Sequence, residues 1–303
     1  MLSIKNGFEI AQIRDKKDKT IHSVYVKDYD EDSTEEINKD IEKLIEKSFY
    51  KNISASNVIL LKRALRTNNE AVLKMNQSLL ELFEKGKILL DDQKNKLITV
   101  EKDQHVQIMP PSNHFSLAVW GPSGVGKSYT IGKFLEAFRK KYKDIPIYIF
   151  SPIKDDKAFV KAKPIYIKID ESILKDPLQT IEFQSGVCVF DDIESLSKQY
   201  YEVISDFRDR CLEVGRHNNI DIISVHHVIQ GGNSTKKIIN ESDMSIVFPR
   251  SNFAAIEKLC RQTYGFDKKD VAYIREVSKK SRWVCIKRSY PSCVISEHEI
   301  KIV

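Results

Sequence analysis

A glycine-rich turn between an apolar run and a helical pattern limits what this chain can fold into. Residues 117–120 have the composition of a buried strand, and the pattern of residues 127–139 predicts a helix. Between them, four residues have the spacing of a phosphate-binding P-loop: Gly121, Gly126, Lys127 and Ser128. Strand, loop and helix follow in the order that a P-loop requires, so we expect a nucleotide site here.

The residue types of this loop suit an anion. Glycines permit close approach of the backbone, so that successive N–H groups can surround phosphate oxygens. Lys127 would give a charge to the outer phosphates, and Ser128 a hydroxyl to Mg²⁺. The predicted ATP-binding residues are Gly121, Pro122, Ser123, Gly124, Val125, Gly126, Lys127, Ser128 and Tyr129. A glycine-rich and serine-rich turn without a ligand is the alternative.

An apolar run that ends in two carboxylates supplies a second half of the site. Residues 187–190 form the run, and Asp191 and Asp192 follow it, as in a Walker B element. We predict that Asp191 holds Mg²⁺ together with Ser128 and that Asp192 activates the attacking water, with Glu194 as a reserve base. The alternative is a pair of aspartates that caps the next helix.

The size of the chain allows one large domain and an appendage. It has 303 residues, of which 41% are hydrophobic and 30% charged. It contains no apolar run long enough to cross a bilayer and no signal peptide pattern, so we expect a soluble protein that stays where it is made. The five cysteines have no C-x-x-C spacing, which predicts reduced, mostly buried thiols.

Two parts of different composition are expected. Residues 1–110 predict an N-terminal appendage, with strands at 8–13 and 21–26, an acidic turn, and then helices whose apolar stripe forms a core or a subunit contact. The expected helices are residues 34–49, 54–66 and 69–85. Residues 111–303 alternate strand and helix, which predicts an α/β P-loop NTPase domain with a mostly parallel sheet flanked by helices.

Positive charge is unevenly placed along the chain. The net charge is +6, and lysine and arginine gather at residues 139–141, 154–163 and 275–288. A basic face on an NTPase suggests a polyanionic partner such as nucleic acid. The alternative is a solvated surface, because lysine is frequent throughout the chain.

The segment after the Walker B helix carries a family resemblance. Residues 215–217 form a Gly-Arg-His turn, and the apolar strand 220–226 follows at once with a polar residue at its tip. This arrangement resembles the FtsK–HerA branch of P-loop motors, and most of all the viral genome-packaging ATPases of poxvirus and giant-virus type. The resemblance runs from residue 115 to the C-terminus, where a basic β-hairpin follows Arg282, and excludes residues 1–110.

The resemblance implies an ATPase that uses ATP and Mg²⁺ and works as a homo-oligomeric ring, a hexamer or a pentamer. It implies double-stranded DNA as a partner, together with capsid or portal vertex proteins, in the host cytoplasm, the viral factory or the virion. Arg216 matches the arginine finger that reaches a neighbour's γ-phosphate, with Arg208 and Arg210 as competitors and a helix-capping charge as the alternative.

One position departs from the family pattern. The strand after Walker B usually ends in a glutamine that senses the γ-phosphate, whereas this chain has His226 and His227. We predict His226 as the sensor, because a histidine can donate a hydrogen bond to phosphate or water. His227, Gln230 and a purely structural His226 stay open.

Three functions are compatible with these motifs. The leading one is an ATP-driven double-stranded DNA translocase that packages a viral genome. A nucleoside or small-molecule kinase would need an arginine-bearing lid, which the sequence does not display. A nucleotide-clamped assembly protein would not need both Asp191 and Asp192.

Overall fold

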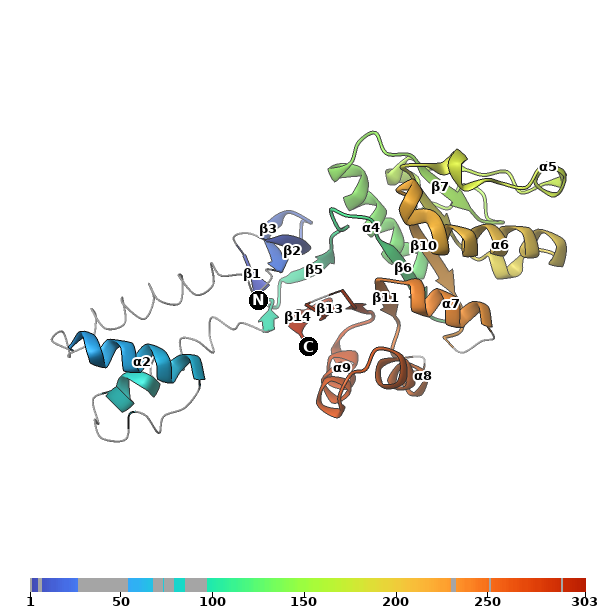
Figure 1. Cartoon of the computed structure of the whole chain (residues 1–303). Coiled ribbons are helices and arrows are strands. Elements are labelled where there is room, and N and C mark those ends of the chain that lie inside the picture. The colour runs from blue at the N-terminus through green and yellow to red at the C-terminus, as the bar shows by residue number, and fades with distance from the viewer. Residues whose placement is uncertain are drawn as a thin grey trace. The chain divides into compact units, whose positions relative to one another are not determined.

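The computed structural model describes residues 2–4, 7–26, 54–67, 73, 79–84, 97–229, 233–250, 252–289 and 291–303. They belong to two compact units, which are treated separately (Figure 1). One unit contains Met1–Ser3 and Lys27–Lys96, and the other Ile4–Val26 and Leu97–Val303. This division differs from the boundary expected at residue 110, because the first strands group with the P-loop unit.

The smaller unit contains the short strand β1 (Leu2–Ser3) and helix α2 (Ala55–Thr67). The helix predicted at residues 54–66 is confirmed, and the Ser54 hydroxyl accepts a bond from Asn57 N at 3.4 Å near its start. A small core joins α2 to buried residues of the predicted third helix, at Leu73 and in the helical residues 79–84. The predicted helix 34–49 and the acidic turn lie outside the described residues.

The larger unit is built on a ten-stranded mixed sheet. In spatial order its strands are β4 (Leu97–Thr99), β14 (Glu299–Ile302), β13 (Cys293–Ser296), β12 (Val284–Lys287), β11 (Met244–Val247), β6 (Ser116–Trp120), β10 (Asp221–His226), β9 (Val187–Phe190), β7 (Ile147–Phe150) and β8 (Ile165–Tyr166). Each strand from β11 to β8 runs parallel to its neighbours in that part of the sheet. This part contains the P-loop strand and the Walker B strand.

The sheet is largely parallel, as predicted, but it is mixed. Strands β12, β13, β14 and β4 extend it in antiparallel fashion beyond β11. The predicted C-terminal hairpin is present as β12 and β13, but β14 and β4 continue it. Short turns connect β12 to β13 and β13 to β14, and strands joined this way must run antiparallel.

Helices cover both faces of the sheet. Figure 1 shows α4 (Lys127–Lys141) on one side of β6 and β10, and α6 (Lys198–Val214) on the other. On the α4 side, Phe115 meets the rings of Phe134 and Phe138 edge to face, with centroids 5.4 and 6.2 Å apart. The helices that share the α6 side are α5 (Glu171–Lys175), α7 (Asn233–Glu241), α8 (Phe253–Lys258) and α9 (Lys268–Lys280).

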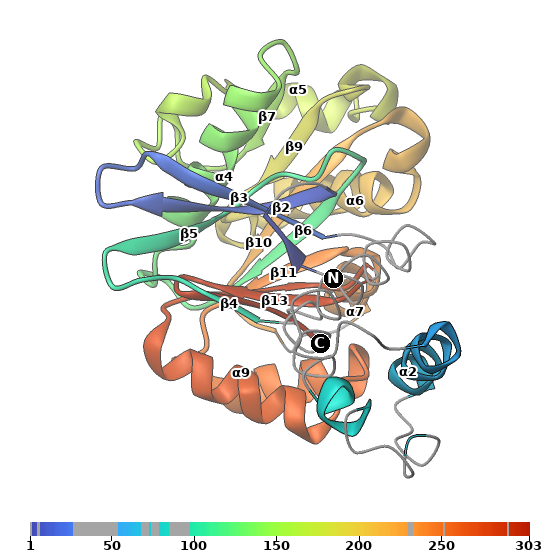
Figure 2. The same cartoon turned by 90° about the vertical axis from the view of Figure 1, so that its left-hand side faces the viewer.

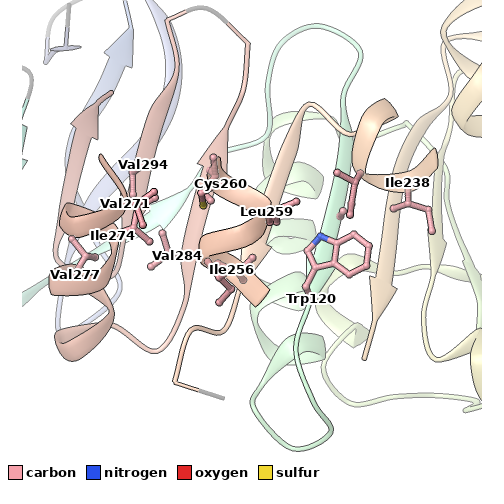
Figure 3. Close-up of a cluster of buried hydrophobic side chains, with 14 residues drawn as sticks. Trp120, Ile238, Ile256, Leu259, Cys260, Val271, Ile274, Val277, Val284 and Val294 are labelled. Carbon is pink, nitrogen blue, oxygen red and sulfur yellow. The ribbon is translucent and has the colours of Figure 1, made fainter. Parts of the chain in front are cut away.

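Alternate residues of the strands form the core on the α6 side. Ala118 and Trp120 of β6 and Val284 of β12 point to the same cluster as the apolar residues of α7, α8 and α9 (Figure 3). A second cluster packs Phe150, Phe183 and Phe190 against Phe207 of α6. All five cysteines are buried and none forms a disulfide, as expected.

A small antiparallel sheet lies in the same unit. Strand β2 (Phe8–Asp15) pairs with β3 (Thr20–Val26) and with β5 (Gln104–Ile108), which confirms the two strands predicted near the N-terminus. It packs beside α4, where Gln107 Nε2 donates to the Lys133 carbonyl at 3.0 Å (Figure 2). Part of the predicted appendage is therefore built into the P-loop unit. Among the described residues, no helix has the length and apolar composition to cross a bilayer.

Candidate nucleotide site

The P-loop connects β6 directly to the first turn of α4. Gly124 and Gly126 have φ angles of 78° and 101°, a left-handed backbone that glycine adopts without a Cβ clash. Gly126 is the residue at which α4 begins, and Lys127 and Ser128 are the first two helical residues. The helix N-terminus thus faces the loop, and its free N–H groups favour an anion there.

Lys127 is turned back onto its own loop. Its Nζ donates to the carbonyls of Gly121 at 2.7 Å and Pro122 at 3.0 Å. The residue is 8% exposed, and burial lowers its pKa, while Asp192, Asp191 and Glu194 oppose that shift. A triphosphate can take over these bonds, because its oxygens are stronger acceptors for an ammonium group than loop carbonyls.

The strand order brings three chain segments to one edge of the sheet. Strand β10 lies between β6 and β9, and all three run parallel, so their carboxyl ends lie side by side. The Gly121 N–H donates to the His226 carbonyl at 3.1 Å, which ties the P-loop to the end of β10. This edge therefore gathers the P-loop, the two histidines and the paired aspartates.

Asp191 is a buried carboxylate at the end of β9. It is 4% exposed, and no other described residue donates a hydrogen bond to its side chain. Burial raises its pKa to about 6, the charges of Asp192 and Asp156 add to this, and Lys127 and His227 oppose it. A desolvated carboxylate of this kind gains from a cation.

The described residues contain no group of three or more His, Cys, Asp or Glu that could hold a metal ion alone. This fits Mg²⁺ in a nucleotide site, because Mg²⁺ is usually held by one or two protein oxygens together with phosphates and water. Asp191 and the Ser128 hydroxyl are the residues that would hold Mg²⁺, and this assignment stays a prediction.

Asp156 was missed in the sequence. It lies in the loop after β7, the strand next to β9, and is close enough to act on the pKa of Asp191. The available signal was an acidic pair, Asp155 and Asp156, after a predicted parallel strand, since such strand ends meet at one edge.

Asp192 and His227 form a chain of contacts to the P-loop lysine. The Asp192 carboxylate lies 2.6 Å from His227 Nε2, and His227 Nδ1 lies 3.3 Å from Lys127 Nζ. The two contacts fit one neutral tautomer, in which Nε2–H donates to Asp192 and Nδ1 accepts from Lys127. Asp192 has a φ of 56°, and non-glycine residues in this left-handed region cluster at functional sites.

His226 has a different environment from the one predicted for a sensor. It is 3% exposed, and its ring stacks near Trp120 with centroids 4.7 Å apart. Its Nε2 lies 2.6 Å from the Ser224 hydroxyl and its Nδ1 3.0 Å from Glu194, so both nitrogens are occupied. His226 is the last residue of β10 and is buried, whereas His227 is the histidine that contacts Lys127 and Asp192, and the choice of sensor between them stays a prediction.

Glu194 interacts with both histidines, His226 and His227. Burial raises its pKa, but the hydrogen bond from His226 and the charges of both histidines outweigh that effect and leave the pKa lowered. A carboxylate with a lowered pKa is a weak base.

Arg216 lies at the other end of β10. It is exposed in the turn Gly215–Asn218, ahead of the strand, and lines a cavity of about 340 Å³. Six strand residues separate it from the P-loop edge, roughly 20 Å at about 3.3 Å per residue. Its side chain has no hydrogen bond or ion pair with another described residue, so the capping role gains no support.

The two competing arginines are engaged within the chain. Arg208 is 1% exposed and pairs with Asp209 at 2.7 Å. Arg210 donates to the Leu178 carbonyl at 3.1 Å and lies 3.4 Å from Asp206. Gln230, the third sensor candidate, lies outside the described residues.

The loop, the buried carboxylate strand and the intervening strand define an α/β P-loop NTPase fold. No protein-family model matches the chain. A protein of the Sputnik virophage, described as "Uncharacterized protein V3", is 30% identical over 214 residues, which cover 70% of this chain and 86% of that protein. The chain belongs to the same family as this virophage protein.

Two solved structures illustrate the likeness of fold. The genome packaging NTPase B204 from Sulfolobus turreted icosahedral virus 2, in complex with ATP-gammaS, is 13% identical with a TM-score of 0.42, and the match covers 61% of this chain and 96% of that one. The pCW3 conjugation coupling protein TcpA is 12% identical with a TM-score of 0.36, over 67% and 66%. A viral genome packaging NTPase, the class of protein that the sequence resembles, is thus among the solved structures to which this chain is similar.

Proposed function

We propose that this protein is an ATPase that moves double-stranded DNA during the packaging of a viral genome. The packaging task comes from the sequence resemblance, and the chemistry from the site. ATP binds at the P-loop with Mg²⁺ held by Ser128 and Asp191, and Asp192 orients the attacking water. In this proposal the protein acts in the host cytoplasm or viral factory, or in the virion.

The observation that carries the proposal is the chain Lys127, His227 and Asp192. A γ-phosphate competes with His227 for the Lys127 ammonium, so ATP binding frees the imidazole. The freed Nδ1 nitrogen can then accept a hydrogen bond from the water, while the Nε2–H continues to donate to Asp192. ATP binding at the P-loop would thereby change the contacts of Asp192, the residue that orients the water in this proposal. A glutamine sensor has the corresponding role in the family that the sequence resembles.

Hydrolysis also needs a positive charge that stabilises the phosphoryl group while it is transferred. Arg216 is exposed at the edge opposite to the P-loop, so it can serve only a neighbouring copy. A ring, hexameric or pentameric, brings one copy's amino-terminal edge to the next copy's P-loop. The finger would contribute about 10³ to 10⁵ in rate, as in other NTPases.

The basic runs contribute less free charge than the sequence suggests. Arg139 donates to the carbonyls of Ala162, Lys143 and Ile145, and Arg288 to three carbonyls around the end of α7. In the run 154–163, by contrast, Lys154 and Lys157 are exposed and have no ion pair with another described residue. We propose that DNA phosphates are gripped there, beside the nucleotide edge.

The test is an ATPase assay with and without linear duplex DNA. We expect duplex to stimulate turnover, and added salt to remove the stimulation steeply with little sequence preference, because the grip is ionic. Phosphate transfer to nucleosides in the absence of DNA would instead favour a kinase. Turnover that is negligible with and without DNA would favour a nucleotide-clamped assembly protein.

A further inference from the structure

A cavity of about 400 Å³ opens beside the first turn of α4. Tyr129 and Thr130, which directly follow the P-loop Ser128, form one side of it. Strand β5 and the turn between β2 and β3 form the facing wall, and Trp283 and Glu297 contribute from the C-terminal strands. We propose that this cavity holds the nucleoside of the bound nucleotide and that the N-terminal strands are part of the nucleotide site.

The position follows from the phosphate site, so the inference rests on the proposed function. If the outer phosphates lie at Lys127 and Ser128, the nucleoside must lie within one triphosphate length of them. Tyr129 and Thr130 are within one helical turn of Ser128, about 5.4 Å of rise. The cavity volume also falls within the range of about 300–1,000 Å³ that is usual for small-ligand pockets.

The lining has the chemistry of a nucleoside site. Tyr129 is 58% exposed, an unusual exposure for an aromatic ring, and can stack on a base. Trp283 is buried at 8% exposure and lines the cavity together with the apolar side chains of Val106 and Ile108. Apolar walls with a few placed polar groups are typical of cofactor pockets.

The polar groups are held in place by ion pairs. Asp18 lies 3.2 Å from Lys133 Nζ and 3.4 Å from His105 Nε2, and Glu297 lies 3.0 Å from Arg282 Nε. The pKa of Asp18 is lowered, because Lys133 and Arg14 outweigh the effect of burial. Two fixed carboxylates can accept hydrogen bonds from ribose hydroxyls or from the amino group of a base.

The facing wall is attached to α4 through one residue. Lys133 bonds Asp18 through its side chain, and its carbonyl accepts from Gln107 of β5 at 3.0 Å. Lys133 lies one turn after Tyr129 on the same helix. Residues that precede the P-loop by more than a hundred positions are thereby fixed at the mouth of the nucleotide site.

The test compares ATP with inorganic tripolyphosphate, which lacks the nucleoside. Calorimetric titration of the whole chain with each ligand and Mg²⁺ gives both affinities. Tyr129→Ala should weaken ATP about tenfold and leave tripolyphosphate unchanged, and Tyr129→Phe should restore most of the ATP affinity, because it keeps the ring. An equal loss for both ligands, or no loss for ATP, would overturn the nucleoside site.

A fluorescence measurement provides a second, independent outcome. The chain has two tryptophans, and only Trp283 lines the cavity. ATP should change the tryptophan emission, tripolyphosphate should not, and Trp283→Phe should abolish the response. An ATP-bound protein whose emission matches the free protein would contradict the inference. His105→Ala should lower the affinity for ATP about threefold. An unchanged affinity would show that the wall formed by β5 and the turn between β2 and β3 is not part of the nucleoside site.

The failure of this inference can be told apart from the failure of the proposed function. Lys127→Ala should abolish binding of both ATP and tripolyphosphate, because it removes the phosphate contact. If that variant binds both normally, the P-loop role itself is wrong. If it loses both but Tyr129→Ala loses neither, only the nucleoside site is wrong.

Discussion

The two ends of strand β10 differ in how their polar residues are bonded. At the carboxyl end, His226 is bonded to Glu194, and His227 is bonded to Asp192 and to Lys127 of the P-loop. At the amino end, Arg216 is exposed and has no partner among the described residues. A nucleotide must therefore replace existing bonds at one end, whereas the other end offers an arginine that a second copy can receive.

Removing the P-loop charge should have the largest effect. Lys127→Ala should weaken ATP by about 100-fold or more, because a buried ammonium that contacts phosphate would be lost. Equilibrium titration with labelled ATP measures this. Lys140→Ala is the matched control on the same helix, since Lys140 is exposed and only pairs with Glu136 at 3.1 Å. If the two variants bound ATP with equal affinity, the assignment of the phosphate site to the carboxyl end of β10 would be wrong.

Removing the arginine from the amino end should affect turnover and leave binding intact. We expect Arg216→Ala to lower the ATPase rate by about 10³, with unchanged ATP affinity. His217→Ala, the exposed neighbour, is the control. Mixing the two inactive variants Arg216→Ala and Lys127→Ala should restore part of the activity, because the arginine of one copy can serve the P-loop of the other. Activity that equals the simple sum of the two proteins would exclude a finger acting between copies.

Substitutions of the two histidines should have different effects, on turnover for His227 and on thermal stability for His226. His227→Ala should lower the turnover rate about 10-fold to 100-fold, because Asp192 loses its contact to the P-loop lysine, and His227→Gln should retain most of it. His226→Gln should instead lower the thermal midpoint, since the ring is packed in the core between Ser224, Glu194 and Trp120. If His226→Gln alone lost turnover at an unchanged midpoint, the original assignment of the sensor would be right.

Substitution of Asp191 should have the smallest effect. The quantity that changes is the free energy of unfolding, and the change depends on pH. The pKa of Asp191 is about 6 in the folded state, against an ordinary value of 3.8. Above pH 6 the folded protein buries a charge, and below it the folded state holds a proton that the unfolded state lacks. Asp191→Asn should therefore stabilise the nucleotide-free protein at pH 8, on the order of 1–3 kcal/mol, and the gain should decline as the pH falls from about 6 towards 3.8.

Chemical denaturation at pH 8 and pH 5 measures that gain. Asp191→Asn should also lose the stabilisation that Mg²⁺ and ATP give to the wild type. A variant that is destabilised at pH 8 would show that the carboxylate is satisfied in the free protein.

Short sequence patterns made it possible to predict the edge of the sheet where the P-loop and the paired aspartates meet. The P-loop spacing and the run ending in Asp191 each describe a few consecutive residues, and parallel strands place their ends together. The choice between His226 and His227 could not be made in the same way, because it depends on where β10 stops. His226 is the last residue in the strand and is directed inward, whereas His227 stands beyond the strand end and is free to turn toward Asp192.

Long-range pairing explains what the sequence did not predict. Strand β4 pairs with β14 across about two hundred residues, and the N-terminal strand β2 lies near α4 because it pairs with β5, which contacts that helix. No periodicity within either segment encodes that contact. The N-terminal strands were therefore recognised as strands, but their place beside the nucleotide site could not be inferred.

The outermost parallel strand, β8, has only two residues, Ile165 and Tyr166. A short border strand offers few unpaired backbone groups, so an incoming chain has little to hydrogen-bond there. In the ring proposed above, a contact between copies at this edge should therefore form through side chains and leave each sheet separate. Such a contact can shift and reopen without breaking backbone hydrogen bonds between strands, which suits the DNA-moving activity proposed for the ring.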